Sequence, residues 1–177
     1  MKMTTLCYPE RDGKYLMMHR VKKENDYNKD KWIGIGGKFE DGESPEECLL
    51  RETWEETGLT LTSWRYRGII SFINDLYETE YMNLYTADAW EGIIGECNEG
   101  TLDWLPCEAV YNLEIWEGDK IFFWLLEQDA SFFSLKLEYH GDKLLGWAYN
   151  GIRCHKISED EDLFEAFKRQ YLEGSIR

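Results

Sequence analysis

The sequence lacks the features of a membrane-embedded or secreted protein. Its longest uninterrupted apolar run, residues 121–126, is far too short to span a bilayer. The opening stretch, MKMTTLCYPERDGKY, contains no apolar segment of signal-peptide type, so we expect no targeting sequence. The five cysteines include no Cys-x-x-Cys pair, which predicts reduced thiols, a cytoplasmic location and no membrane partner.

Positive charge is also scarce. The chain has 20 lysines and arginines against 35 aspartates and glutamates, which gives a formal net charge of −15. An acidic domain repels polyanions, so we expect no nucleic-acid polymer as a partner. A small phosphorylated substrate remains compatible with this charge, because a bound metal ion can supply the local positive potential that a phosphate needs.

The composition is that of a globular domain. With 177 residues, of which 43% are hydrophobic, the chain can build a substantial core, and we predict a single domain over residues 1–177. Apolar periodicity and turn residues predict strands at 4–8, 14–20, 32–39, 64–73, 80–90, 101–105, 132–139 and 143–149, with hairpins joining the first two and the last two, and helices at 45–57, 119–127 and 160–173. The last helix would have Leu163, Phe164, Phe167 and Leu172 on its apolar side. Mixed strands and helices indicate an α/β/α sandwich or an α+β layer fold.

The segment that follows Ser44 has strong helix signals. Ser44 suits the N-cap, Pro45 suits the first helical position, and Glu47 completes a capping box. Gly58 can end the helix in a left-handed conformation. The residues expected to face the core along this helix are Leu49, Leu50, Thr53, Trp54 and Thr57.

Three glutamates, Glu52, Glu55 and Glu56, gather on the opposite face of that helix. Like charges three or four positions apart destabilise a helix by about 0.2–0.5 kcal/mol per pair. A face of this kind is most often simply solvated. Alternatively, a divalent cation lies against it, since Mg²⁺ binds carboxylate oxygens and substrate phosphates. The glycine-rich stretch 34–37 favours the cation, because glycine lets the backbone approach a metal or phosphate closely.

Residues 37–59, GKFEDGESPEECLLRETWEETGL, resemble the signature motif of the Nudix hydrolase family. Every glycine and charged position of that signature is present, and one departure is Thr53, where the family prefers an aliphatic residue. The resemblance implies a Nudix-type α/β/α sandwich with a mixed sheet. It also implies hydrolysis of a nucleotide substrate with Mg²⁺ as cofactor, or with Mn²⁺ in its place.

The same resemblance implies which residues bind metal and phosphate. The metal ligands would be Gly36, Glu52, Glu55 and Glu56. Arg51 would orient one of these glutamates, Glu43 would stabilise the junction between loop and helix, and Lys38 would lie near phosphate.

The general base varies within the family that the motif resembles. Glu52 is one candidate, and a glutamate of a later loop, Glu96 or Glu99, is another. Of the two loop residues we favour Glu99, although an exposed loop carboxylate without a catalytic role is an equally ordinary finding. The expected catalytic residues are therefore Glu52, Arg51, Glu55 and Glu99.

Two further stretches, KWIGIGGKFEDGE and NLEIWEGDKIFFWLL, look like MutT-type hydrolases of oxidised purine triphosphates. By this resemblance Trp116 would stack on the base, Asp119 would hydrogen-bond its edge, and Tyr27 would form a second aromatic wall. Simple core packing of Trp116 is the alternative. Two departures affect base recognition: Gly118 replaces the first of two consecutive aspartates, and Ile33 replaces an asparagine.

Three functions are compatible with these motifs. The first is a nucleoside triphosphate diphosphatase that converts 8-oxo-dGTP to monophosphate and pyrophosphate. The second is a Nudix enzyme that cleaves a nucleoside diphosphate linked to another group, such as ADP-ribose. The third, a nucleotide sensor without catalysis, ranks last because all box glutamates are retained. Residues 132–177 would pack on the domain as an extension, and the protein would be a monomer or a homodimer.

Overall fold

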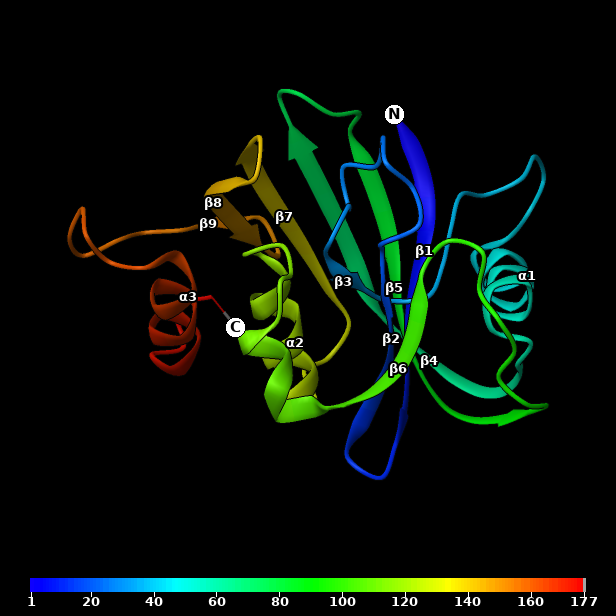
Figure 1. The fold of residues 1–177 in the computed structure, drawn as a ribbon. Coiled ribbons are helices and arrows are strands. Elements are labelled where there is room, and N and C mark those ends of the chain that lie inside the picture. Colours follow the sequence, from blue (N-terminus) through cyan, green and yellow to red (C-terminus); the bar gives the residue numbers. More distant parts are fainter. Residues whose placement is uncertain (177) are drawn as a thin grey trace.

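A mixed β-sheet of nine strands forms the centre of the computed structural model, which describes residues 1–176 (Figure 1). The strands are β1 (Lys2–Arg11), β2 (Lys14–His19), β3 (Trp32–Ile33), β4 (Thr60–Asn74), β5 (Glu80–Glu91), β6 (Thr101–Pro106), β7 (Phe133–His140), β8 (Lys143–Tyr149) and β9 (Ile152–Arg153). Their order is β3-β2-β1-β5-β4-β7-β8-β9, and β6 pairs with β2.

Both parallel and antiparallel pairs occur in this sheet. β1 runs parallel to β5, and β4 is antiparallel to β5 but parallel to β7. β1 is longer than the predicted strand 4–8, because β5 pairs along it from Lys2 to Pro9. The chain then turns at Asp12 and Gly13, both with positive φ, into the predicted hairpin with β2.

Helices cover both faces of the sheet, as the sandwich prediction requires. They are α1 (Pro45–Thr57), the 3₁₀ helix η1 (Cys107–Asn112), α2 (Asp119–Glu127) and α3 (Leu163–Leu172). Figure 1 places α1 on one side of the sheet and α2 with α3 on the other. The smaller core, which includes Cys7, Leu49 and Tyr85, lies under α1, and the larger core, which includes Tyr8, Phe122 and Phe167, lies on the other side. No helix within residues 1–176 is long and apolar enough to cross a membrane.

The predicted ends of α1 are confirmed. The Ser44 hydroxyl accepts a hydrogen bond from the amide of Glu47, the Glu47 side chain accepts one from the amide of Ser44, and Gly58 is left-handed. The predicted core face was wrong in one respect, because Trp54 is 61% exposed whereas Glu56 is only 8% exposed. The helix is rotated toward Glu56, since the amide of Gly36 offers that carboxylate a buried partner.

The C-terminal segment packs on the sheet and on α2. β7 and β8 form the predicted hairpin, and the indole of Trp147 donates a hydrogen bond to the carbonyl of Leu163 over 2.9 Å. α3 begins later than the predicted residue 160, because the Asp162 carboxylate caps its first amides. Phe167 is fully buried, but Leu172, which was expected on the same apolar side, is 64% exposed. Arg177 lies outside the described residues.

This packing predicts that α3 contributes strongly to stability. Phe167→Ala should lower the free energy of unfolding by about 3–5 kcal/mol, because it leaves a cavity in the larger core. Leu172→Ala, on the same helix, should change it by no more than about 0.5 kcal/mol. Urea unfolding followed by circular dichroism measures both. Equal effects of the two substitutions would show that α3 does not pack on the domain in solution.

Candidate active site

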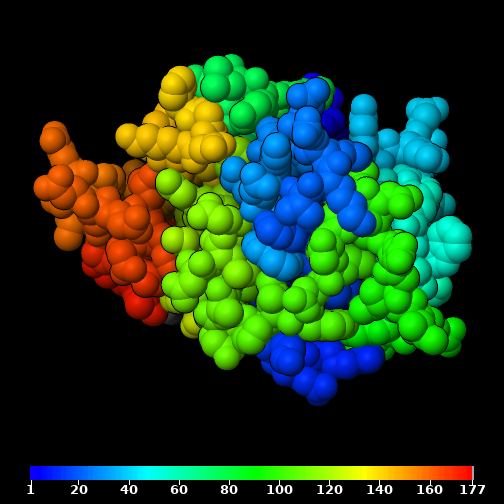
Figure 2. All heavy atoms as spheres, viewed as in Figure 1, coloured from blue at the N-terminus to red at the C-terminus, as the bar shows by residue number. Residues whose placement is uncertain are grey.

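A cavity of about 270 Å³ opens beside the ends of β1 and β5. Its wall is built from these strands, from the glycine-rich residues 33–38, from the start of α2, and from residues 20–31, which we call loop 20–31. Figure 2 shows this loop in blue across the front of the molecule, beside the green segment that follows β5. The cavity therefore joins segments that are far apart in the sequence.

Carboxylates gather where residues 36–37 meet α1. The amide of Gly36 donates to Oε2 of Glu56 over 3.0 Å. A Cβ atom on Gly37 would lie 2.4 Å from the carboxyl carbon of Glu52, so a side chain at position 37 would displace this carboxylate. Burial, together with the charges of Glu99 and Glu52, raises the pKa of Glu56 to about 8, and burial also raises the pKa of Glu52.

Arg51 connects α1 to the loop that precedes it. Its guanidinium donates to both carboxylate oxygens of Glu43 over 2.6 and 2.8 Å, to Glu52 over 2.7 Å, and to Glu55 over 3.3 Å. It also donates to the carbonyl of Lys38 over 3.0 Å. The hydrogen bonds from Arg51 lower the pKa of Glu43 to about 2, so this pair stays charged. Arg51 thus contacts two box glutamates and, through Glu43, joins α1 to the preceding loop.

Glu99 faces the same carboxylates from the loop between β5 and β6. It lines the cavity, and it forms ion pairs with Arg20 and Lys23. Burial acts to raise the pKa of Glu99, but the hydrogen bond from Lys23 and the charge of Arg20 outweigh it, so the pKa is lowered. Glu96 is exposed, which makes Glu99 the better placed of the two loop candidates.

These residues fit a divalent cation chemically, although they are not arranged as a finished ligand set. No group of three or more His, Cys, Asp or Glu side chains within residues 1–176 is positioned to hold a metal ion. Instead, Arg51 engages Glu52 and Glu55, and Gly36 binds Glu56 through its amide rather than through the carbonyl that the motif implies. Burial and the charges of Glu99 and Glu52 raise the pKa of Glu56, and a cation bound beside these carboxylates would favour the ionised form.

The opposite end of the cavity is aromatic. Trp116 is 5% exposed, packs edge-on against Phe72 at 5.1 Å, and donates from its indole to Oδ1 of Asn28 over 2.8 Å. Trp116 belongs to the larger core and also lines the cavity, so core packing and a position beside a ligand are compatible for this residue. Ile33 adds an apolar wall.

Asp119 lies at this end as a buried acid. It is 6% exposed, and no donor from residues 1–176 hydrogen-bonds to its carboxyl group. Burial raises the pKa of Asp119 well above its ordinary value, although the charge of Lys31 acts in the opposite direction. Burial therefore favours the protonated form of Asp119, in which the carboxyl group can donate a hydrogen bond to a ligand.

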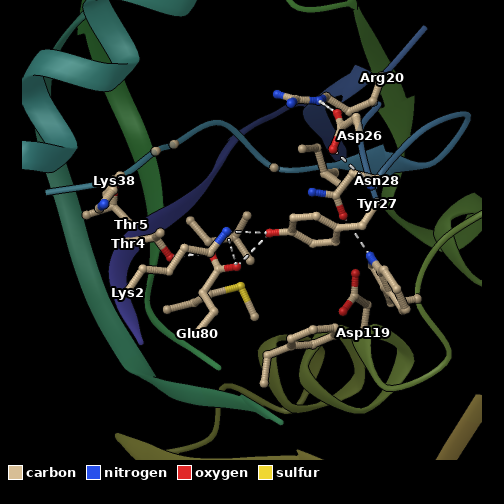
Figure 3. A pocket seen from close by; sticks show the side chains of 18 of the residues that line it. Lys2, Thr4, Thr5, Arg20, Asp26, Tyr27, Asn28, Lys38, Glu80 and Asp119 are labelled. Carbon is tan, nitrogen blue, oxygen red and sulfur yellow. Dashed lines mark hydrogen bonds and ion pairs between the residues drawn. The ribbon is translucent and has the colours of Figure 1, made fainter. Parts of the chain in front are cut away.

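Tyr27 reaches across the cavity from loop 20–31 (Figure 3). Its hydroxyl donates to Oε2 of Glu80 over 2.7 Å and accepts from Nζ of Lys2 over 2.8 Å. Lys38 lies at the exposed rim. Sequence reasoning missed Lys2 and Glu80, because only the pairing of β1 with β5 brings them together.

Comparison with known proteins gives consistent results. The model of the family described as NUDIX domain matches residues 3–125. An oxidized purine nucleoside triphosphate hydrolase from Danio rerio is 30% identical over 92% of this chain and 97% of its own length, and one from Mus musculus is 30% identical over 62% and 71%. The crystal structure of a mutator MutT protein from Bacillus halodurans superposes with a TM-score of 0.75 at 27% identity, over 85% of this chain and 98% of that one.

Buried Glu56 predicts that stability of the metal-free protein depends on pH. Its pKa rises from 4.5 to about 8 on folding, so the folded state binds the proton more tightly. The stability from this group is complete below the unfolded pKa and is lost as pH rises through the folded pKa. In EDTA, the Tm should therefore fall by several degrees between about pH 5.5 and 8.5.

Glu56→Gln supplies the control for this measurement. Its amide oxygen can still accept from Gly36, but the side chain no longer titrates, so the fall in Tm should be clearly smaller. A wild-type Tm that is constant or rises over this pH range would contradict the buried, protonated state of Glu56.

Proposed function

Because this chain belongs to the Nudix family, we propose that it hydrolyses a purine nucleoside triphosphate with an oxidised base, such as 8-oxo-dGTP, to the monophosphate and pyrophosphate. One observation carries the proposal: a single cavity joins an aromatic end that holds a buried acid, Asp119, to a carboxylate cluster. The aromatic end suits a purine base, and the carboxylate cluster suits the divalent cation that accompanies a triphosphate. The names of the relatives from Danio rerio and Mus musculus support the same substrate class.

The reaction adds one water molecule across the anhydride bond between the α- and β-phosphates. A bond forms between the water oxygen and phosphorus, the bridging P–O bond breaks, and the proton of the water passes to a general base. When bound, Mg²⁺ or Mn²⁺ would neutralise phosphate charge and acidify the attacking water. Gly36, Glu52, Glu55 and Glu56 would hold the cation, and Arg51 keeps two of these glutamates in place.

Glu99 is the preferred general base. Its lowered pKa keeps it ionised at neutral pH, so it can accept a proton, and its ion pairs with Arg20 and Lys23 fix its orientation. Glu52, whose pKa is raised, is the second candidate. Lys38 at the rim would contact the phosphates.

The base would enter the aromatic end between Trp116 and Tyr27, whose ring centroids are 6.2 Å apart. Tyr27 and loop 20–31 must move outward for this, because that spacing leaves no room for a base between the rings. Asp119, in the protonated form that its burial favours, would then donate a hydrogen bond to an acceptor on the base edge. We further propose that residues 1–177 form one domain and that the protein acts in the cytoplasm.

Product analysis tests the substrate assignment. With Mg²⁺, 8-oxo-dGTP should be converted to 8-oxo-dGMP and pyrophosphate with a higher kcat/KM than dGTP, because in the proposed complex Trp116 and Asp119 would contact the oxidised base. ATP and ADP-ribose should be poorer substrates. Chromatographic separation of the products identifies the bond that is cleaved. Cleavage of ADP-ribose alone would contradict the proposal.

A matched pair of loop variants tests the general base. Glu99→Gln should lower kcat about 10²- to 10⁴-fold, because the amide cannot accept the proton of water. Glu96→Gln, in the same loop but exposed, should leave kcat nearly unchanged. Steady-state kinetics and Tm are measured for both. Equal, small effects on kcat would exclude Glu99 as the base and direct attention to Glu52.

A further inference from the structure

Tyr139 contacts the start of α2 from β7, outside the matched residues 3–125. The side chain is 3% exposed, and its hydroxyl oxygen accepts a hydrogen bond from the amide of Gly118 over 2.8 Å. Gly118 is the N-cap of α2 and has no side-chain capping bond. The hydroxyl of Tyr139 therefore supplies a buried partner for the residue at which the helix begins.

Gly118 is a glycine because of space and not because of backbone conformation. Its φ of −69° is ordinary helical geometry that any residue can adopt. A Cβ atom there would lie 2.6 Å from the hydroxyl oxygen of Tyr139 and 2.7 Å from a methyl carbon of Leu137. A side chain at position 118 is thus incompatible with Tyr139 in its observed place.

The same tyrosine contacts the aromatic wall of the cavity. Its ring packs edge-on against Trp116, with centroids 5.2 Å apart at 75°, and lies 5.0 Å from Phe72. The carbonyl of Trp116 accepts a hydrogen bond from the amide of Asp119, so residues 116–119 form one turn. Tyr139 holds this turn at both Trp116 and Gly118, between the two groups that would bind the base.

We propose that Tyr139 is a positioning residue for base recognition, and that the Gly118–Tyr139 pair leaves Asp119 as the buried acid of this turn that reads the base, since Glu117 is exposed. The inference rests on the proposed function, because it assumes that Trp116 and Asp119 contact the substrate. Tyr139 acts through these two residues. It determines where the indole and the carboxyl group lie and has no part in cleavage of the anhydride.

Tyr139→Phe removes the hydroxyl and keeps the ring. The KM for 8-oxo-dGTP should rise about tenfold, since one buried hydrogen bond is lost. The value of kcat should stay within about twofold, because the carboxylate cluster is untouched. Tyr111→Phe is the matched control: its hydroxyl donates to Glu127 over 2.7 Å at the other end of α2. This variant should keep the wild-type KM, and Tm values report any general loss of stability.

Gly118→Ala tests the steric part of the proposal. In the wild-type background it should raise KM, because its Cβ displaces Tyr139. In the Tyr139→Phe background the same substitution should raise KM by a smaller factor. The nearest clashing atom is then absent, and the two methyl carbons of Leu137, at 2.7 and 2.8 Å, are the ends of one flexible side chain. Independent, multiplicative effects of the two changes would overturn the proposal, as would a Tyr139→Phe KM equal to that of Tyr111→Phe.

Failure of this inference differs from failure of the proposed function. A wild type that cleaves 8-oxo-dGTP while Tyr139→Phe has an unchanged KM refutes only the positioning role. A wild type that leaves 8-oxo-dGTP intact refutes the proposed function, and calorimetry with 8-oxo-dGMP then tests the positioning role directly. Tighter binding by wild type than by Tyr139→Phe supports that role, and equal binding or none overturns it.

Discussion

The hydrogen bond from the amide of Gly36 to Glu56 is the interaction on which the candidate site depends. It fixes the glycine-rich loop against α1 and orients a carboxylate that is 8% exposed. The loop can lie there only because position 36 has no side chain, since a Cβ atom would come within 2.0 Å of the carbonyl oxygen of Thr5. The result is a cluster in which burial, and to a smaller extent the charges of Glu99 and Glu52, raise the pKa of Glu56, and a bound cation would offset these effects.

Loop 20–31 links this cluster to the aromatic end of the cavity. At one end Arg20 and Lys23 hold Glu99, and at the other Tyr27 binds Glu80 while Asn28 accepts a hydrogen bond from Trp116. The same segment therefore contacts the groups that would bind phosphate and those that would bind the base. Its polar, irregular sequence suits a connection that must open for substrate and close over it.

The sequence predicts the parts of this architecture that depend on local signals. The ends of α1 follow from Ser44 and Gly58, and the motif led us to expect Arg51 beside a box glutamate, where it contacts Glu52. Partners brought together by tertiary structure were not predictable. Trp54 has an apolar side chain and was expected to face the core, yet it is exposed. The helix instead turns Glu56 inward, where its carboxylate accepts a hydrogen bond from Gly36, a tertiary contact that helical periodicity does not reveal.

The most direct test of the central claim is a calorimetric titration of Mg²⁺ into the protein at about pH 7, repeated in buffers with different ionisation enthalpies. With a pKa of about 8, Glu56 holds a proton at this pH and must lose it when it becomes a metal ligand. We predict release of roughly one proton per bound cation by the wild type and much less by Glu56→Gln. Binding without proton release, or with equal release by the variant, would contradict the account.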